Sequence, residues 1–124
     1  MNSNDPRNVE TLPVALVPTP ASPVGGVGTV SLAITLDHAS DANTTVQIDC
    51  GDHALLVSPN GIWPYQAPVP AGVTSTSIVL STNSVTTSTN VQIRGGGATE
   101  NMANPANWTA TTVLAIGPNP VNPG

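Results

Sequence analysis

The sequence is short of charge, and above all of positive charge. Only 7% of its 124 residues are charged, whereas about a quarter is usual for a soluble domain. It has no lysine, so Arg7 and Arg94 stand against seven acidic residues, and the formal net charge is −5. A nucleic-acid-binding protein needs cations that displace counterions from phosphates. This composition therefore excludes that class of protein.

Long apolar runs and a cysteine pair are missing as well. A membrane-spanning helix needs about 20 consecutive apolar residues, and the runs here extend over only a few residues. The first ten residues lack the basic-then-apolar pattern of a secretory signal. A single cysteine, Cys50, excludes an internal disulfide framework. We therefore expect no membrane contact and a fold held together by packing or by assembly.

What the sequence does contain is a strand pattern. Its β-branched residues argue against disorder, and between Val30 and Leu36 large apolar residues alternate with small or hydroxylated ones. The same alternation surrounds Val46 and Ile48, Ile78 and Leu80, Val91 and Ile93, and Leu114 and Ile116. A further short strand is expected within 53–58. Turn residues separate these runs and no stretch has a helical period, so we predict an all-β antiparallel sandwich of about seven strands.

Proline and glycine divide the chain into three parts. Residues 1–25 form a proline-rich segment that we expect to be an extended arm, although it can include a first edge strand. The sandwich is expected over 26–116. Residues 117–124 read GPNPVNPG and are expected to form a second extended tail.

Five strand-and-turn segments carry a resemblance to a known family. They are VSLAITL (30–36), TTVQI (44–48), VPAGVTSTSIVLST (69–82), STNVQIR (88–94) and TTVLAI (111–116). Together they resemble the bacterial immunoglobulin-like domains (Big or Calx-beta-like) of bacterial surface proteins and of phage virion proteins. The resemblance implies an immunoglobulin-like β-sandwich with a structural or binding role. The chain departs from it at 59–68, which is rich in proline and aromatic residues, and at 95–107, which is a long connection.

The segment DCGDH (49–53) is the first candidate for chemistry, because it places a cysteine and a histidine close together. However, Cys50 has the same parity as Val46 and Ile48, which predicts that it lies on the core face as a small apolar residue. A structural zinc site needs four ligands, usually at paired spacings. We therefore expect no enzyme activity, no metal and no cofactor.

Calcium is the other metal to consider. Asp37 and Asp41 flank one predicted turn, and Asp49 and Asp52 flank the next. Calcium prefers several oxygen ligands, but the ordered spacing of a calcium loop is absent. Aspartate is also common in turns because its side chain hydrogen-bonds its own backbone. The sequence therefore favours turn chemistry over calcium binding.

The aromatic residues point to a binding surface. Trp63 and Tyr65 lie in a proline-rich segment, 61–68, and such rings are frequent at interface hot spots. Trp63 can equally fold inward and replace the phenylalanine that the core lacks, and paired rings can stack on a sugar. Trp108, at the start of the last strand, is expected to pack on the core or its edge.

The N-terminal segment offers a second contact surface. Leu12, Val14 and Leu16 alternate with Pro13, Ala15 and Val17. This pattern suits a strand added to the sheet edge of a neighbouring subunit. The alternative is that 12–17 forms the first strand of the sandwich itself. The sequence leaves both arrangements open.

The sequence thus predicts a structural or binding protein. Our leading hypothesis is a capsid decoration or cement protein on a bacteriophage virion, which contacts capsid or sister subunits through Leu12, Val14, Leu16, Trp63 and Tyr65 and is a homo-oligomer. One alternative is an adhesin-type module that binds a glycan or cell surface outside the cell. Another is the subunit of an extracellular filament joined by strand exchange.

Overall fold

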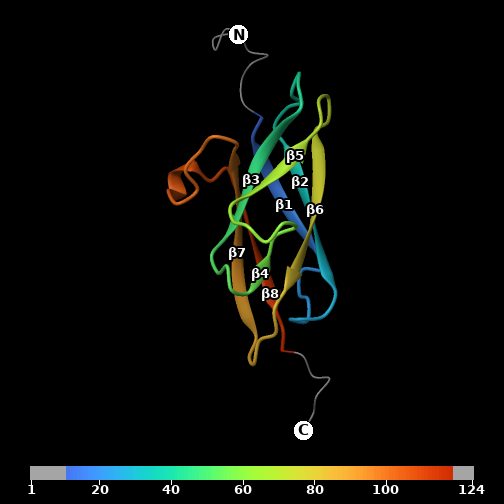
Figure 1. The fold of residues 1–124 in the computed structure, drawn as a ribbon, viewed down its shortest axis with the longest axis vertical. Helices are drawn as coiled ribbons and strands as arrows, with labels where there is room; N and C mark the ends of the chain where they lie inside the picture. The colour runs from blue at the N-terminus through green and yellow to red at the C-terminus, as the bar shows by residue number, and fades with distance from the viewer. Residues whose placement is uncertain (1–10, 119–124) are drawn as a thin grey trace.

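A computed structural model describes residues 11–118 as two four-stranded antiparallel sheets packed face to face (Figure 1). The strands are β1 (Pro13–Thr19), β2 (Thr29–Leu36), β3 (Thr44–Cys50), β4 (Leu56–Val57), β5 (Tyr65–Val69), β6 (Ser75–Thr82), β7 (Thr89–Gly97) and β8 (Ala110–Ile116). One sheet has the order β1-β2-β6-β4, and the other has the order β5-β3-β7-β8. The predicted β-sandwich is therefore confirmed, with eight strands.

The alternating pattern explains why the two sheets pack together. In β2, Val30, Leu32 and Ile34 are fully buried, whereas the residues between them are exposed. Successive side chains of a strand point to opposite faces, so each strand gives one face to the core. The fully buried large side chains are Leu32, Ile34, Ile48, Leu56, Leu80, Ile93, Leu114, Ile116, Val30, Val46, Val69 and Val91. The core is thus aliphatic and drawn from both sheets.

Six of the eight strands are arranged as in immunoglobulin-like domains, but β4 and β5 occupy the D and C′ positions in the reverse chain order. Strands β1, β2 and β6 correspond to the A, B and E strands of such domains, and β3, β7 and β8 correspond to C, F and G. The region 53–58 forms a strand over only two residues, Leu56–Val57. β5 was not among the predicted strands, because Pro68 lies within it. It tolerates proline because it is the edge strand of its sheet.

Residues 13–25 belong to the sandwich. β1 pairs with β2, and the chain then crosses to the other sheet, where Ala115 donates its N–H to the carbonyl of Ala21 (3.1 Å) and Gly117 donates to Pro23 (2.9 Å). The first strand of the fold is therefore its own, which was the alternative to an arm over 1–25. The rest of the predicted arms, residues 1–10 and 119–124, lies outside the described residues.

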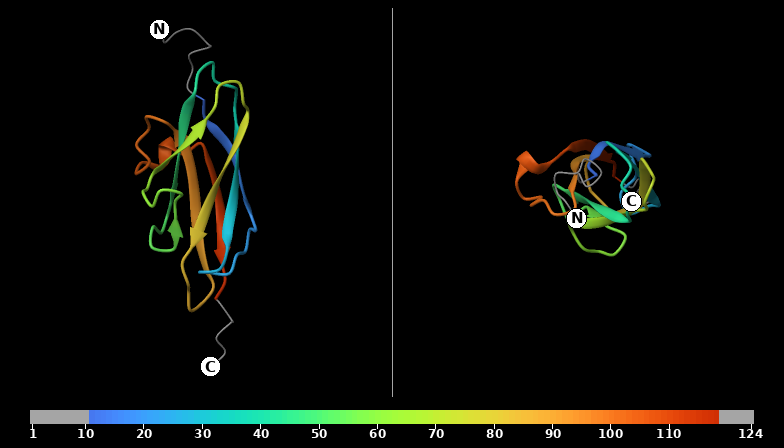
Figure 2. Two further views of the ribbon diagram at one scale, coloured as in Figure 1. Left: turned by 45° about the vertical axis from the view of Figure 1, so that its right-hand side comes forward. Right: turned by 90° about the horizontal axis from the view of Figure 1, so that it is seen from above.

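The described chain begins at one end of the long axis of the sandwich and finishes at the other (Figure 1). The connection between β7 and β8 stands off the side of the second sheet (orange in Figure 2) and contains a 3-10 turn over Pro105–Asn107. Within residues 11–118, no helix has the length and apolarity needed to cross a bilayer.

Candidate functional site

The outer face of the first sheet carries only small, uncharged side chains. We call it the bare face and define it by the outward-pointing residues of β1, β2 and β6, namely Val14, Ala15, Val17, Thr19, Thr29, Ser31, Ala33, Thr35, Ser75, Ser77, Val79 and Ser81, all exposed. Ala33 lies at its centre, opposite Val17 on one side and Ser77 on the other. No side chain on this face is longer than valine. The result is an uncharged surface of short side chains.

The three N-terminal contact residues expected from the sequence do not share one face. A β-bulge shifts the register between Pro13 and Ala15, so Val14 and Ala15 both point outward. Val14 is half exposed, whereas Leu16 is 5% exposed and belongs to the core. Leu12 is half-buried, and its N–H donates to Asp37 Oδ1 (2.9 Å). Only Val14 of the three is free to meet a partner with most of its side chain.

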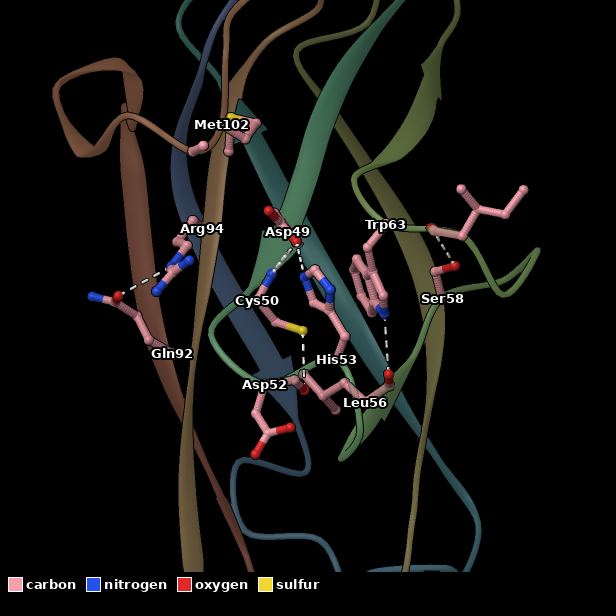
Figure 3. A network of polar contacts seen from close by, with 12 residues as sticks. Asp49, Cys50, Asp52, His53, Leu56, Ser58, Trp63, Gln92, Arg94 and Met102 are labelled. Carbon is pink, nitrogen blue, oxygen red and sulfur yellow. Dashed lines mark hydrogen bonds and ion pairs between the residues drawn. The ribbon is translucent and has the colours of Figure 1, made fainter.

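Trp63 and Tyr65 are both partly buried and pack against the core. The indole Nε1 of Trp63 donates to the carbonyl oxygen of Leu56 (3.1 Å). Its ring stacks on that of His53, with centroids 5.8 Å apart and planes inclined by 16° (Figure 3). One face of the indole and its only donor are therefore occupied within the protein. This arrangement is closer to the inward-folded interpretation of Trp63 than to an open sugar platform.

The exposed apolar residue of this loop is Ile62, which the sequence analysis did not single out. It is 63% exposed. Its backbone is fixed at both ends, because its N–H donates to Asn60 Oδ1 (3.1 Å) and its carbonyl accepts from Ser58 Oγ (2.7 Å). The signal was present in the turn sequence Asn60-Gly61, where an asparagine side chain caps its own turn.

Asp49, Cys50 and His53 meet at the end of β3 (Figure 3). Asp49 Oδ1 accepts from the Cys50 N–H (2.8 Å) and lies 2.6 Å from His53 Nε2. Cys50 is 2% exposed, as its parity predicted, and its Sγ donates to the carbonyl of Asp52 (3.4 Å). Burial, reinforced by the negative charge of Asp49, raises the pKa of the Cys50 thiol to about 11. The thiol is thus protonated at neutral pH and is a poor nucleophile.

Three of the four aspartates considered for calcium, Asp37, Asp49 and Asp52, make separate hydrogen bonds in the structure. Asp37 Oδ1 accepts from the N–H of Leu12 (2.9 Å), and Asp52 Oδ1 accepts from that of Ala54 (2.9 Å). Within 11–118, the group of three or more potential metal ligands is the Asp49, Cys50 and His53 cluster, which includes just one of these carboxylates. Asp52 therefore caps its own turn, as turn chemistry predicted, whereas Asp37 holds the backbone of Leu12, which is distant in sequence.

The buried side-chain amide of Gln47 holds the connection between β7 and β8 against β3. Gln47 is 6% exposed, and its Nε2 donates to the carbonyl oxygens of Gly97 (2.8 Å) and Glu100. A buried polar group of this kind is stable only when its hydrogen bonds are made. Gln47 thus ties the start of the loop to β3.

The far side of the same loop is held by Trp108 and Met102. The indole Nε1 of Trp108 donates to the Met102 carbonyl (2.9 Å), and the guanidinium of Arg94 lies 4.1 Å from the centroid of the Trp108 ring. Met102 is 2% exposed and lies against Gly96, where an added Cβ would be 2.7 Å from the methionine Sδ. Trp108 therefore packs against Arg94 of β7 and the Met102 carbonyl of the loop, and it is not among the residues that pack on the core.

No protein-family model matches the sequence, and no curated protein matches it either. The two packed antiparallel sheets define the protein as a β-sandwich. Because a fold of this type hosts many functions, the function must come from the surfaces and clusters described above.

Proposed function

We propose that the protein is a non-catalytic structural component of a large assembly, a decoration or cement protein on a bacteriophage capsid. The observation that carries this proposal is the bare face. An isolated soluble protein usually spreads charge over its whole surface, whereas three adjacent strands here, β1, β2 and β6, present none. A partner that covers this face would explain the lack of charge.

The physical chemistry of the bare face favours docking. Short side chains such as Ser31, Ala33 and Ser77 lose little rotamer entropy when they are covered. Removing a charged group from water would oppose association. Docking on the bare face removes none. Apolar groups at Val17 and Val79, both about half exposed, contribute about 25 cal/mol per Å² of apolar area that a partner covers.

The repeated lattice of a capsid multiplies weak contacts of this kind. Copies bound at neighbouring sites, or joined to each other, gain avidity without any new contact. The resemblance to immunoglobulin-like domains of phage virion proteins supports the same assignment. On this proposal Val14 and the exposed loop residue Ile62 contact capsid or sister subunits, and the protein resides on the virion.

The test is reconstitution of particles. Phage particles are purified from a strain whose copy of this gene is deleted, and the purified chain is added back before sedimentation. We expect the chain to co-sediment with these particles at a fixed stoichiometry and to increase their resistance to heat. The proposal fails if wild-type particles lack the chain or if the added chain stays in the supernatant.

A matched pair of variants locates the contact. Ser77→Arg adds one charge to the bare face beside its central residue Ala33, and Asn90→Arg adds the same charge to an exposed position of β7 on the other sheet. We expect Ser77→Arg to weaken particle binding at least about tenfold, which corresponds to about 1.4 kcal/mol, while Asn90→Arg binds normally. Equal binding of both variants would remove the bare face from the interface.

A further inference from the structure

The cluster at the end of β3 brings three different metal-ligating side chains together. The ligand atoms of Asp49, Cys50 and His53 all lie within 4.8 Å of one another. No metal is expected here from the sequence pattern, because the segment lacks paired zinc-ligand spacings. From the geometry we propose that Asp49, Cys50 and His53 form a Zn²⁺ site with three protein ligands and a fourth position occupied by water.

The distances require only small movements to form this site. Zinc bonds of about 2.0–2.3 Å in a tetrahedron separate neighbouring ligand atoms by roughly 3.3–3.6 Å. The contact between Asp49 Oδ1 and His53 Nε2, now 2.6 Å, would open to admit the ion, and the other separations would close by up to about 1.5 Å. Asp49 and Cys50 are fixed in β3. His53 lies in the following turn with its side chain 54% exposed, so it is free to make this adjustment.

The donor set selects zinc over calcium or magnesium. Hard cations prefer shells made of oxygen, whereas a thiolate and an imidazole suit zinc and similar transition metals. The Cys50 thiolate and the Asp49 carboxylate together balance the +2 charge of the ion. Asp52 and Arg94 are the further charged groups that act on Cys50, with opposite signs. The loaded site is therefore close to neutral, as its half-buried position requires.

Neighbouring contacts already orient the ligands. The Cys50 N–H donates to Asp49 Oδ1, and the His53 ring is stacked on Trp63, which is itself anchored by its hydrogen bond to Leu56. Supporting contacts of this type typically fix the orientation of metal ligands. In Figure 3 the sulfur and the imidazole approach each other from the two sides of the turn.

The proton balance of binding is simple. When Zn²⁺ binds, the S–H bond of Cys50 breaks, the sulfur keeps the electron pair and donates it to the metal, and the proton passes to solvent. A neutral His53 binds through Nε2 and carries its proton on Nδ1. No oxidation or reduction takes place. Because the site exists only in the folded chain, binding stabilises the fold and ties the turn after β3 to the strand.

The experiment uses the full chain, reduced and stripped of metal with a chelator that is then removed. Co²⁺ serves as the spectroscopic probe, and Zn²⁺ is added as a competitor. We expect one equivalent of Co²⁺ to produce a thiolate-to-cobalt charge-transfer band, which Zn²⁺ then abolishes, and we expect Zn²⁺ to raise the melting temperature. The absence of the charge-transfer band at saturating Co²⁺ would overturn the proposal.

Three variants test the ligands. His53→Gln changes an exposed side chain, so the fold should survive, and we expect affinity to fall by at least about tenfold. Cys50→Ser should abolish the band. The matched control is His38→Gln, because His38 Nδ1 also contacts an aspartate, Asp37 Oδ1 at 2.8 Å, but without a cysteine in the group. Unchanged affinity in His53→Gln, or a loss in His38→Gln equal to that in His53→Gln, would contradict the proposed site, even if Cys50→Ser fails to fold.

Discussion

The outer faces of the two sheets are built from opposite kinds of side chain. The bare face of β1, β2 and β6 has nothing longer than valine and no charge. The outer face of β3 and β7 carries Gln47, Asp49, Gln92 and Arg94, each with a hydrogen bond or ring contact inside the protein. The second sheet thus uses its long polar side chains to hold loops in place, whereas the side chains of the bare face hold no loop within residues 11–118.

The two sheets therefore show two different reasons for polar residues on an outer face. On the second sheet, polar residues stabilise the fold, because Gln47 anchors the loop between β7 and β8 and Asp49 anchors the turn after β3. Within residues 11–118, no serine or threonine side chain of the bare face forms a hydrogen bond to another element. On our proposal, a partner that covers this face accounts for these residues.

The largest effect is expected where the loop lies on the second sheet. Gly96→Ala would place a Cβ 2.7 Å from Met102 Sδ and 2.9 Å from the carbonyl oxygen of Asn107. The sulfur can move, but the backbone oxygen cannot do so without displacing the loop. We expect the free energy of unfolding in urea to fall by about 2–3 kcal/mol. Gly117→Ala is the matched control, because its Cβ would meet only Pro23 O at 3.8 Å, and an equal loss in both variants would contradict this account.

Sequence patterns predicted the sandwich well because period-two alternation depends on the pleat alone. Cys50 is a clear example, since its parity with Ile48 placed it in the core and the structure has it 2% exposed. The same rule failed at Val14. A bulge next to Pro13 adds one residue to β1, and no local pattern announces a bulge, so Leu12, Val14 and Leu16 were wrongly grouped on one face.

Contacts between loops were the least predictable part. The DCGDH segment indicated that Asp49 and His53 are neighbours, but the stack of His53 on Trp63 joins residues ten positions apart across β4. Likewise, nothing near Gln47 in the sequence shows that it supports Glu100. Such contacts depend on how two loops pack on a finished sheet, which is a tertiary effect.

Alkaline pH should destabilise the fold, because the buried Cys50 thiol then ionises. In the folded chain burial raises the pKa of Cys50 from 9.0 to about 11, so the unfolded chain ionises first as pH rises. The stabilisation is complete below pH 9 and is lost as pH passes through 11. With a chelator present, we expect wild type to lose about 2 kcal/mol by pH 11 relative to Cys50→Ser. Parallel stability curves for the two proteins would refute a raised thiol pKa.

Gln47→Leu tests the anchor of the loop. Leucine keeps the approximate volume of the side chain but leaves the carbonyls of Gly97 and Glu100 without their donor. We expect a loss of about 1–2 kcal/mol in unfolding free energy, with faster amide exchange confined to the loop. The control is Gln66→Leu, an exposed glutamine opposite Gln47 on β5, which should change stability by less than about 0.5 kcal/mol. Equal effects would mean that the loop does not depend on the buried amide.

The smallest effect, and the one that decides the contrast, is expected on the bare face. Ser77→Ala and Thr35→Ala remove hydroxyl groups from exposed strand positions, so each should change the free energy of unfolding by less than about 0.5 kcal/mol. Losses above about 1 kcal/mol would show that the hydroxyl groups stabilise the sheet, and the case for a partner on this face would weaken. If Ser77→Ala and Thr35→Ala leave stability unchanged while Ser77→Arg loses particle binding, these hydroxyl groups do not contribute to folding. The lack of charge on the bare face then has one remaining explanation, which is the surface that covers it.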